Sequence, residues 1–226
     1  MSQHHTNIIR IKAVSAALSY LNEKVVFVGG ATVSLYADRT VFEVRPTDDI
    51  DVLIEILNYV NRTELESRLR EVGFLHDTES SIVCRFKIHG ITVDIMPTKD
   101  ASIGFNRKWH AEGFEKALNF NIDESCTINL LSAPYFIASK LEAFKDRGEN
   151  DGRTSKDFED IIFVLENRKV IWEEMNILQG KIKEYLQYEF TQLLKNPNIS
   201  EWIDGHVERG SPPATRLIME EMKKFA

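Results

Sequence analysis

The strongest structural signal in this chain is a pair of alternating apolar segments that meet at a turn. Between residues 82 and 88 apolar side chains recur at every second position, and the same alternation returns between residues 91 and 96. His89 and Gly90 separate the two segments, and a two-residue connection of this kind joins antiparallel strands. A period of two sends successive side chains to opposite faces of a sheet. We therefore expect a β-hairpin in which Asp94 lies on the face opposite its two apolar neighbours.

The remaining patterns divide the chain into a half that alternates helices with strands and a half that is helical. Apolar runs predict further strands at residues 25–28 and 50–57. Apolar spacings of three and four, together with capping residues, predict helices, and the predicted ranges are 11–21, 31–37, 63–72, 132–144, 155–166, 171–194 and 213–225. We expect an α+β fold with two domains, 1–131 containing the sheet and 132–226 containing the helical bundle.

Composition excludes several classes of protein. The chain has 226 residues, a net charge of −7 and a sequence pI near 5.5, which argues against a broad basic surface for duplex nucleic acid and leaves open a local basic groove. Two cysteines cannot form a disulfide framework or a four-thiolate zinc site. Neither a membrane span nor a signal peptide is predicted. We expect a cytoplasmic protein with no membrane partner.

The most informative segment for function is residues 45–51, with the sequence RPTDDID. Asp49 and Asp51 are two positions apart at the start of an apolar strand, so their side chains leave the same face. Their mutual repulsion reaches roughly several kcal/mol where solvation is poor. A solvated strand edge would relieve it, and so would bound Mg²⁺, which takes carboxylate oxygens as ligands. Asp94 is either a solvent-facing strand residue or a third acid of a site that holds two Mg²⁺ ions.

Two adjacent glycines, Gly29 and Gly30, end the predicted strand at residues 25–28. Glycine lets the backbone approach a ligand closely, and the N–H groups that open the following helix would face a triphosphate. An ordinary strand-to-helix turn is the alternative interpretation. The pair gains significance because it precedes the two aspartates within one strand–turn–helix–strand unit.

This combination resembles the nucleotidyltransferase superfamily that includes DNA polymerase β. Its members carry a Gly-Gly or Gly-Ser turn, an Asp-x-Asp pair on the next strand and a third Asp on a later strand. Gly29, Gly30, Asp49, Asp51 and Asp94 match that order. The resemblance implies a mixed β-sheet with flanking helices and a two-metal Mg²⁺ site formed by the three aspartates. Eighteen residues separate Gly30 from Asp49, more than in compact members, so we expect extra structure between them.

The helical half carries a second group of charged residues. Lys140 and Arg147 share one helical face, and Asp157 and Asp160 share another. Solvated faces or an interhelical ion-pair network would account for them. The order of residues also resembles AbiEii-type nucleotidyltransferases, which include toxins of type IV toxin–antitoxin systems. The matching positions are Lys140, Ala143, Arg147, Lys156, Asp157, Asp160 and Ile161.

That second resemblance implies roles for the charged residues. Lys140 would bind the phosphates of a nucleoside triphosphate (NTP) in the active-site cleft, with Arg147 as a second phosphate contact. Asp157 or Asp160 would hold Lys140 in place, and Asp160 is favoured because it lies deeper in the apolar helix. Arg45 and Thr47 would help to order the site.

The expected activity is Mg²⁺-dependent transfer of a nucleoside monophosphate from NTP to an acceptor hydroxyl. The toxin relatives imply the 3′ end of tRNA as acceptor and an antitoxin protein as partner, although the acidic composition gives RNA no independent support. A small hydroxyl compound, as in antibiotic-modifying relatives, and a protein hydroxyl are the alternatives. A non-catalytic nucleotide-binding module is the interpretation from a different class.

Overall fold

The computed structural model describes residues 2–21, 23–39, 44–55, 59–98, 108–148, 151–208 and 214–226. The chain forms two compact units. The sheet unit comprises Met1–Ser34 and Val41–Ser132, and the helical unit comprises Leu35–Thr40 and Ala133–Ala226. The α+β fold class predicted from the sequence is confirmed.

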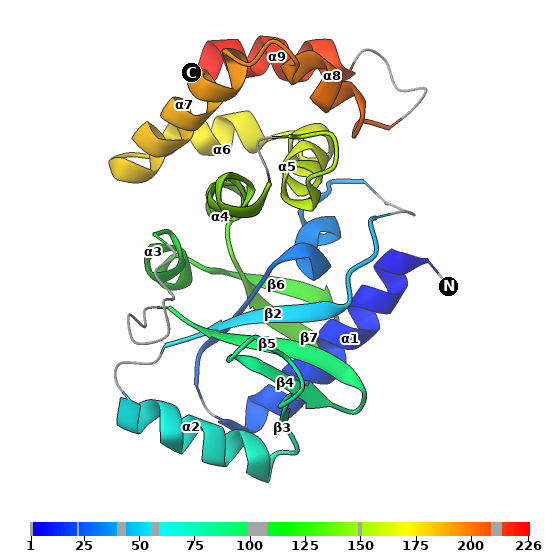
Figure 1. Cartoon of the computed structure of the whole chain (residues 1–226), viewed down its shortest axis with the longest axis vertical. Coiled ribbons are helices and arrows are strands. Elements are labelled where there is room, and N and C mark those ends of the chain that lie inside the picture. The colour runs from blue at the N-terminus through cyan, green and yellow to red at the C-terminus, as the bar shows by residue number, and fades with distance from the viewer. Residues whose placement is uncertain are drawn as a thin grey trace. The chain divides into compact units, whose positions relative to one another are not determined.

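Among the described residues of the sheet unit, seven strands form one mixed sheet in the order β3-β4-β5-β2-β1-β7-β6 (Figure 1). Strand β2 pairs in parallel with β5 and antiparallel with β1, and β1 pairs in parallel with β7. The strand bounds are β1 Val25–Val28, β2 Asp49–Ile54, β3 Leu75–His76, β4 Arg85–Ile88, β5 Ile91–Pro97, β6 Leu118–Asp123 and β7 Cys126–Leu130. The residues of β1, β2 and β5 are mostly buried, so the central strands form the core of this unit.

Helices flank this sheet, and α1 contacts its strands β2 and β7. Helix α1 buries Ile11, Val14 and Leu18, which recur every three or four residues and so form one apolar face. The Ser2 side chain caps its first turn by accepting a hydrogen bond from the His5 N–H. The helical segments that begin in this unit are α1 Gln3–Leu18, α2 Tyr59–Glu71, α3 His110–Glu115 and the 3₁₀ segments η1 Ser19–Leu21 and η2 Gly30–Tyr36.

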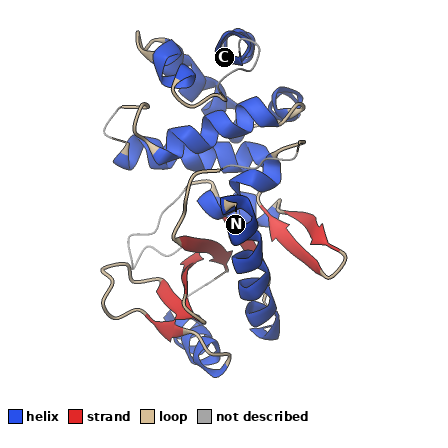
Figure 2. Ribbon diagram, turned by 90° about the vertical axis from the view of Figure 1, so that its right-hand side faces the viewer, coloured by secondary structure: helices blue, strands red, loops and turns tan. Residues whose placement is uncertain are grey.

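The helical unit is built around aromatic contacts. All strands in the described part of the chain lie in the sheet unit (Figure 2). The rings of Phe144, Phe158 and Trp202 lie within 5.3 to 6.1 Å of one another, which joins α4, α5 and α8. The helix bounds are α4 Ala133–Arg147, α5 Lys156–Asn167, α6 Ile171–Ile177, α7 Lys181–Leu194, α8 Ile199–Asp204 and α9 Ala214–Phe225.

The long interval between Gly30 and Asp49 contains a segment that belongs to the helical unit. The Asp38 N–H donates to the carbonyl of Asn167 at 3.0 Å, and the N–H of Lys169 donates to the Asp38 carboxylate at 2.7 Å. The ring of Tyr36 lies 4.6 Å from that of Phe136. These contacts are the extra structure that the interval was predicted to carry.

Several local predictions differ from the structure. The first hairpin strand begins at Arg85 instead of residue 82, because the Arg85 N–H donates to the carbonyl of Ile82 in a turn. The segment 171–194 forms two helices instead of one, because the backbone leaves helical geometry before Gly180, whose φ is +73°. Strands β3, β6 and β7 and helix α3 were not predicted, and α1 begins at Gln3 instead of residue 11.

Some predicted ranges lie partly outside the described residues, namely the end of the 50–57 strand and the start of the 213–225 helix. Within the described ranges, none of the helices combines the length and apolar character that crossing a lipid bilayer requires.

Candidate functional site

Three carboxylates from two neighbouring strands lie on one face of the sheet. Asp51 in β2 is directly paired with Asp94 in β5, and Asp49 precedes Asp51 by two positions on β2. Directly paired residues, and residues two apart on one strand, project from the same face. The side chain of Asp94 is only 9% exposed, whereas that of Asp49 is 31% exposed. The structure therefore brings the three predicted acids together and leaves Asp49 the more accessible to solvent.

Arg85 links two of these acids. Its Nε and Nη2 donate to the two oxygens of Asp94, both at 2.8 Å, and Nη2 also donates to Oδ2 of Asp49 at 2.9 Å. The hydrogen bonds to Asp94, with the charges of the nearby aspartates, hold the pKa of Arg85 above its usual value. A guanidinium that donates to two carboxylates offsets their mutual repulsion.

The glycine turn makes room for side chains of this site. A Cβ atom on Gly29 would overlap the carboxylate of Asp51, because the two would lie closer together than the 3.0 Å that real Cβ atoms keep from other heavy atoms. A Cβ on Gly30 would overlap the guanidinium of Arg45 in the same way. Gly29 also has a φ of +73°, which favours glycine. The Gly29 carbonyl accepts hydrogen bonds from the Thr32 N–H at 3.2 Å and the Thr32 hydroxyl at 2.8 Å, which closes the turn.

The segment before β2 is tied to helix α1. Thr47 is buried, and its hydroxyl donates to Oδ1 of Asp49 at 3.2 Å. The guanidinium of Arg10 in α1 donates to the Thr47 carbonyl at 2.9 Å. Thr47 thus orients the more exposed carboxylate of the pair, while α1 holds Thr47.

The donor set has the chemistry of a site for a hard divalent cation, because all three side chains offer carboxylate oxygens. Within the described ranges, no group of three or more His, Cys, Asp or Glu side chains is placed to hold a metal ion as it stands. Arg85 places a positive charge beside these carboxylates and is bonded to Asp49 and Asp94. A cation bound at Oδ2 of Asp49 would therefore lie beside the guanidinium that donates to the same oxygen.

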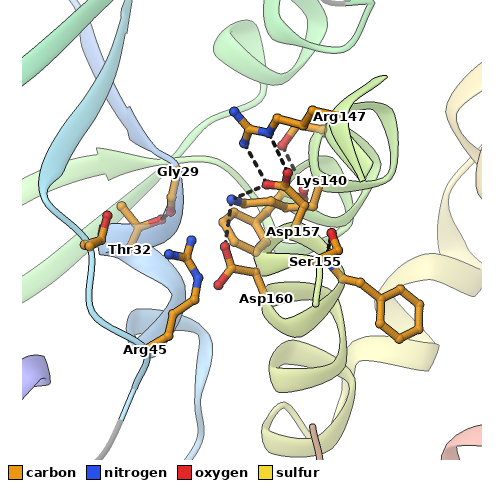
Figure 3. Close-up of polar contacts among 12 residues, drawn as sticks. Gly29, Thr32, Arg45, Lys140, Arg147, Ser155, Asp157 and Asp160 are labelled. Atoms are coloured by element: carbon orange, nitrogen blue, oxygen red, sulfur yellow. Dashed lines mark hydrogen bonds and ion pairs between the residues drawn. The ribbon is translucent and has the colours of Figure 1, made fainter. Parts of the chain in front are cut away.

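A separate ionic cluster lies in the helical unit, between α4 and α5 (Figure 3). The Lys140 ammonium lies 2.7 Å from Oδ2 of Asp160 and 3.1 Å from Oδ1 of Asp157. Arg147 donates to both oxygens of Asp157, at 2.7 and 2.9 Å. Lys140 therefore contacts both aspartates, and its contact with Asp160 is the shorter.

Burial distinguishes the two cations of this cluster. The Lys140 side chain is 7% exposed, and that of Arg147 is 65% exposed. Burial acts to raise the pKa of Asp157, yet the hydrogen bonds from Arg147 and the charge of Lys140 bring it down to about 2. The cluster has two positive and two negative charges and is neutral overall. Arg147 is therefore the cation that solvent reaches, and Lys140 is the buried cation that contacts the buried carboxylates.

The sequence-predicted residues thus fall into two groups. The sheet unit contains Gly29, Gly30, Arg45, Thr47, Asp49, Asp51 and Asp94, and the helical unit contains Lys140, Arg147, Asp157 and Asp160. Sequence reasoning missed Arg85. The hairpin turn at His89 and Gly90 pairs Ile88 with Ile91 and so pairs Arg85 with Asp94, a register that could have been counted outward from the turn.

Comparison with known proteins gives a fold and no family. No protein-family model and no curated protein sequence matches the chain. The solution structure of the antibiotic-resistance factor ANT(2'')-Ia is similar, with a TM-score of 0.52, 16% identity, and coverage of 84% of this chain and 95% of that chain. A nucleotidyltransferase-like antigenic protein from Paracoccidioides brasiliensis matches with a TM-score of 0.54, 16% identity, and coverage of 89% and 94%. The chain has the fold of these nucleotidyltransferase-like structures.

Proposed function

We propose that this protein transfers a nucleoside monophosphate from NTP to an acceptor hydroxyl. The observation that carries the proposal is the set of three carboxylates on one sheet face, with Asp51 fitted against Gly29 at the end of β1. A purely structural sheet gains nothing from concentrating like charges in this way. The nucleotidyltransferase-like fold of the similar structures supports the same activity.

Asp49, Asp51 and Asp94 would hold the divalent cations, with Mg²⁺ as the expected metal in a two-metal site. When bound, Mg²⁺ neutralises charge on the phosphates and lowers the pKa of the attacking hydroxyl. Arg45, whose guanidinium lies against Gly30, would contact the phosphates beside the N–H groups of the glycine turn.

The reaction balances without a further reactant. The acceptor oxygen forms a bond to the α-phosphorus, and the bond from that phosphorus to the bridging oxygen of the β-phosphate breaks. Pyrophosphate leaves with the electron pair, and the hydroxyl proton passes to a carboxylate of the site. Asp94 would help to activate the acceptor hydroxyl, and two hydrogen bonds from Arg85 hold its carboxylate in a single orientation.

Lys140 and Arg147 are proposed to contribute to nucleotide binding, as the AbiEii-type resemblance implies. Arg147 has the greater exposure and can donate to a phosphate. Lys140, Asp157 and Asp160 would act through Arg147 by holding the cluster together. A KM for NTP that rises in Arg147→Gln, with an unchanged kcat, would fit this assignment.

The acceptor defines three versions of the proposal. An RNA 3′ end, with an antitoxin as regulatory partner, follows from the toxin-like resemblance. A small hydroxyl compound is favoured by the fold likeness to an antibiotic-resistance factor. A protein hydroxyl is a third candidate. Incubating the enzyme with each α-labelled NTP and a whole-cell extract, then sizing the labelled product, distinguishes the three.

Asp49→Asn tests the activity itself, with Asp48→Asn as its matched control. Asp48 is the exposed neighbour of Asp49, so the control makes the same change of charge one position away. We expect label transfer to fall by about a hundredfold or more in Asp49→Asn and to persist in Asp48→Asn. Equal transfer by the two variants would reject the proposal. Nucleotide binding by the wild type without turnover would favour a non-catalytic binding module.

A further inference from the structure

Arg85 makes unequal contacts with the acids that surround it. Its guanidinium forms two hydrogen bonds with Asp94, and only Nη2, which is already engaged with Asp94, reaches Asp49. Arg85 and Asp94 are directly paired across β4 and β5, whereas Asp49 lies on β2. The hydrogen bonds from Arg85 to Asp94 therefore join neighbouring residues of the hairpin. The hydrogen bond to Asp49 depends on Nη2, which also donates to Asp94.

Strand β4 carries a second cationic side chain, which contacts a carboxylate outside the candidate site. Lys87 is two residues farther along the same face of β4, and its ammonium contacts Asp77 at 3.0 Å. Arg85, by contrast, bonds to two carboxylates of the candidate site. This difference supplies a matched pair of positions for experiment.

We propose that Arg85 is a positioning residue that holds Asp94 permanently and gives up its contact with Asp49 to a divalent cation. The inference rests on the proposed function, since it assumes that Asp49 ligates metal. An Asp49 oxygen that ligates a cation is less available to Nη2, and the cation repels the guanidinium. The two hydrogen bonds to Asp94 keep the arginine at its place while the third is exchanged.

A merely structural arginine would behave differently. If Arg85 only stabilised the hairpin, its removal would leave metal affinity unchanged or weaken it through disorder of the carboxylates. If Arg85 competes with the cation for Asp49, its removal strengthens metal binding. The direction of the change therefore separates the two roles without any measurement of catalysis.

The experiment measures Mn²⁺ binding to the full chain by electron paramagnetic resonance, in wild type, Arg85→Gln, Lys87→Gln and Asp49→Asn. Arg85→Gln is expected to bind Mn²⁺ about tenfold more tightly than wild type, the scale of one charge-assisted contact. Lys87→Gln is expected to match wild type, and Asp49→Asn to lose the binding. Thermal unfolding in EDTA and in Mg²⁺ gives an independent readout. The unfolding temperature of Arg85→Gln should rise more on addition of Mg²⁺ than that of Lys87→Gln.

The outcomes separate this inference from the proposed function. One outcome is that wild type binds Mn²⁺ and needs Asp49 to do so, while Arg85→Gln binds Mn²⁺ no more tightly than Lys87→Gln. That result overturns the role of Arg85 and leaves the metal site intact. Absence of binding in both wild type and Arg85→Gln overturns both proposals. Binding by Arg85→Gln alone supports the competition. Arg85→Lys keeps the charge but cannot span two carboxylates, so it should bind about threefold more tightly, and wild-type affinity in that variant would count against the role.

Discussion

The carboxylate of Asp51 occupies the space in which a Cβ atom on Gly29 would lie. The glycine directly follows β1, and the aspartate is paired with Val28, the last residue of that strand. A small residue at the end of one strand therefore sets the position of an acid on the next. This relationship explains why the glycine turn and the aspartate pair occur together in the chain.

Gly29→Ala is expected to lose both stability and transfer activity. Gly90→Ala is the matched control, because Gly90 has a φ of +75° against +73° at Gly29 and a Cβ atom there would meet nothing within 4 Å. Each variant should lose about 1–2 kcal/mol from left-handed backbone strain. Only Gly29→Ala should displace Asp51 and reduce label transfer. Urea unfolding and the transfer assay check this, and equal activity in the two variants would contradict it.

Lys140→Met is expected to be strongly destabilising. The substitution leaves Asp160 without its 2.7 Å ammonium contact and leaves Asp157 with Arg147 as its charged partner. Breaking a buried ion pair costs about 3–5 kcal/mol, because a buried charge stays uncompensated. Lys224→Met, which breaks an exposed pair with Glu221, should cost far less, because solvent screens an exposed ion pair. Chemical denaturation of both variants measures the difference, and similar free energies of unfolding would argue against a structural role for Lys140.

Acid should remove the stability contributed by Asp157. The folded-state pKa of its carboxyl is about 2, below the ordinary value of 3.8, so folding favours the ionised form. This contribution is complete above about pH 4 and is lost as pH falls through 2, on the order of 2 kcal/mol in total. The gap in unfolding free energy between wild type and Asp157→Asn should therefore shrink between pH 5 and pH 2. A gap that stays constant over this range would refute the assignment.

The two cysteines should differ in reactivity. Burial raises the pKa of the Cys84 thiol to about 11, and the negative charge of Asp94 adds to the effect. At pH 8 only about one Cys84 in a thousand is a thiolate, the reactive form. Cys126 is half-buried. A disulfide reagent at pH 8 should label Cys126 in the native protein and Cys84 only after unfolding, with Cys126→Ser as the assigning variant. Prompt release of two equivalents by native wild type would show the expectation to be wrong.

Much of the candidate site could be predicted from short-range patterns. The alternation that contains Asp94 and the two-residue spacing of Asp49 and Asp51 determine which face each side chain takes, because the β backbone repeats every two residues. Ser155 before α5 could be predicted as a cap, and its hydroxyl accepts from the Phe158 N–H at 3.3 Å. The register that pairs Arg85 with Asp94 is likewise implied by the position of the hairpin turn.

Other features depend on contacts between distant segments. The placement of β2 between β1 and β5, which sets Asp51 against both Val28 and Asp94, is a choice among several strand orders that the same local patterns allow. The partition of Leu35–Thr40 into the helical unit has the same origin.

The chain's own order of residues therefore determined which chemical groups are present, their spacing and the face on which each one lies. Local backbone geometry is enough for that, since it acts within a few residues. The tertiary structure decided which groups from distant segments meet: Arg85 with Asp49, and Lys140 with both Asp157 and Asp160. Those meetings follow from burying apolar surface between segments far apart in the chain, a global requirement that no short stretch of sequence encodes.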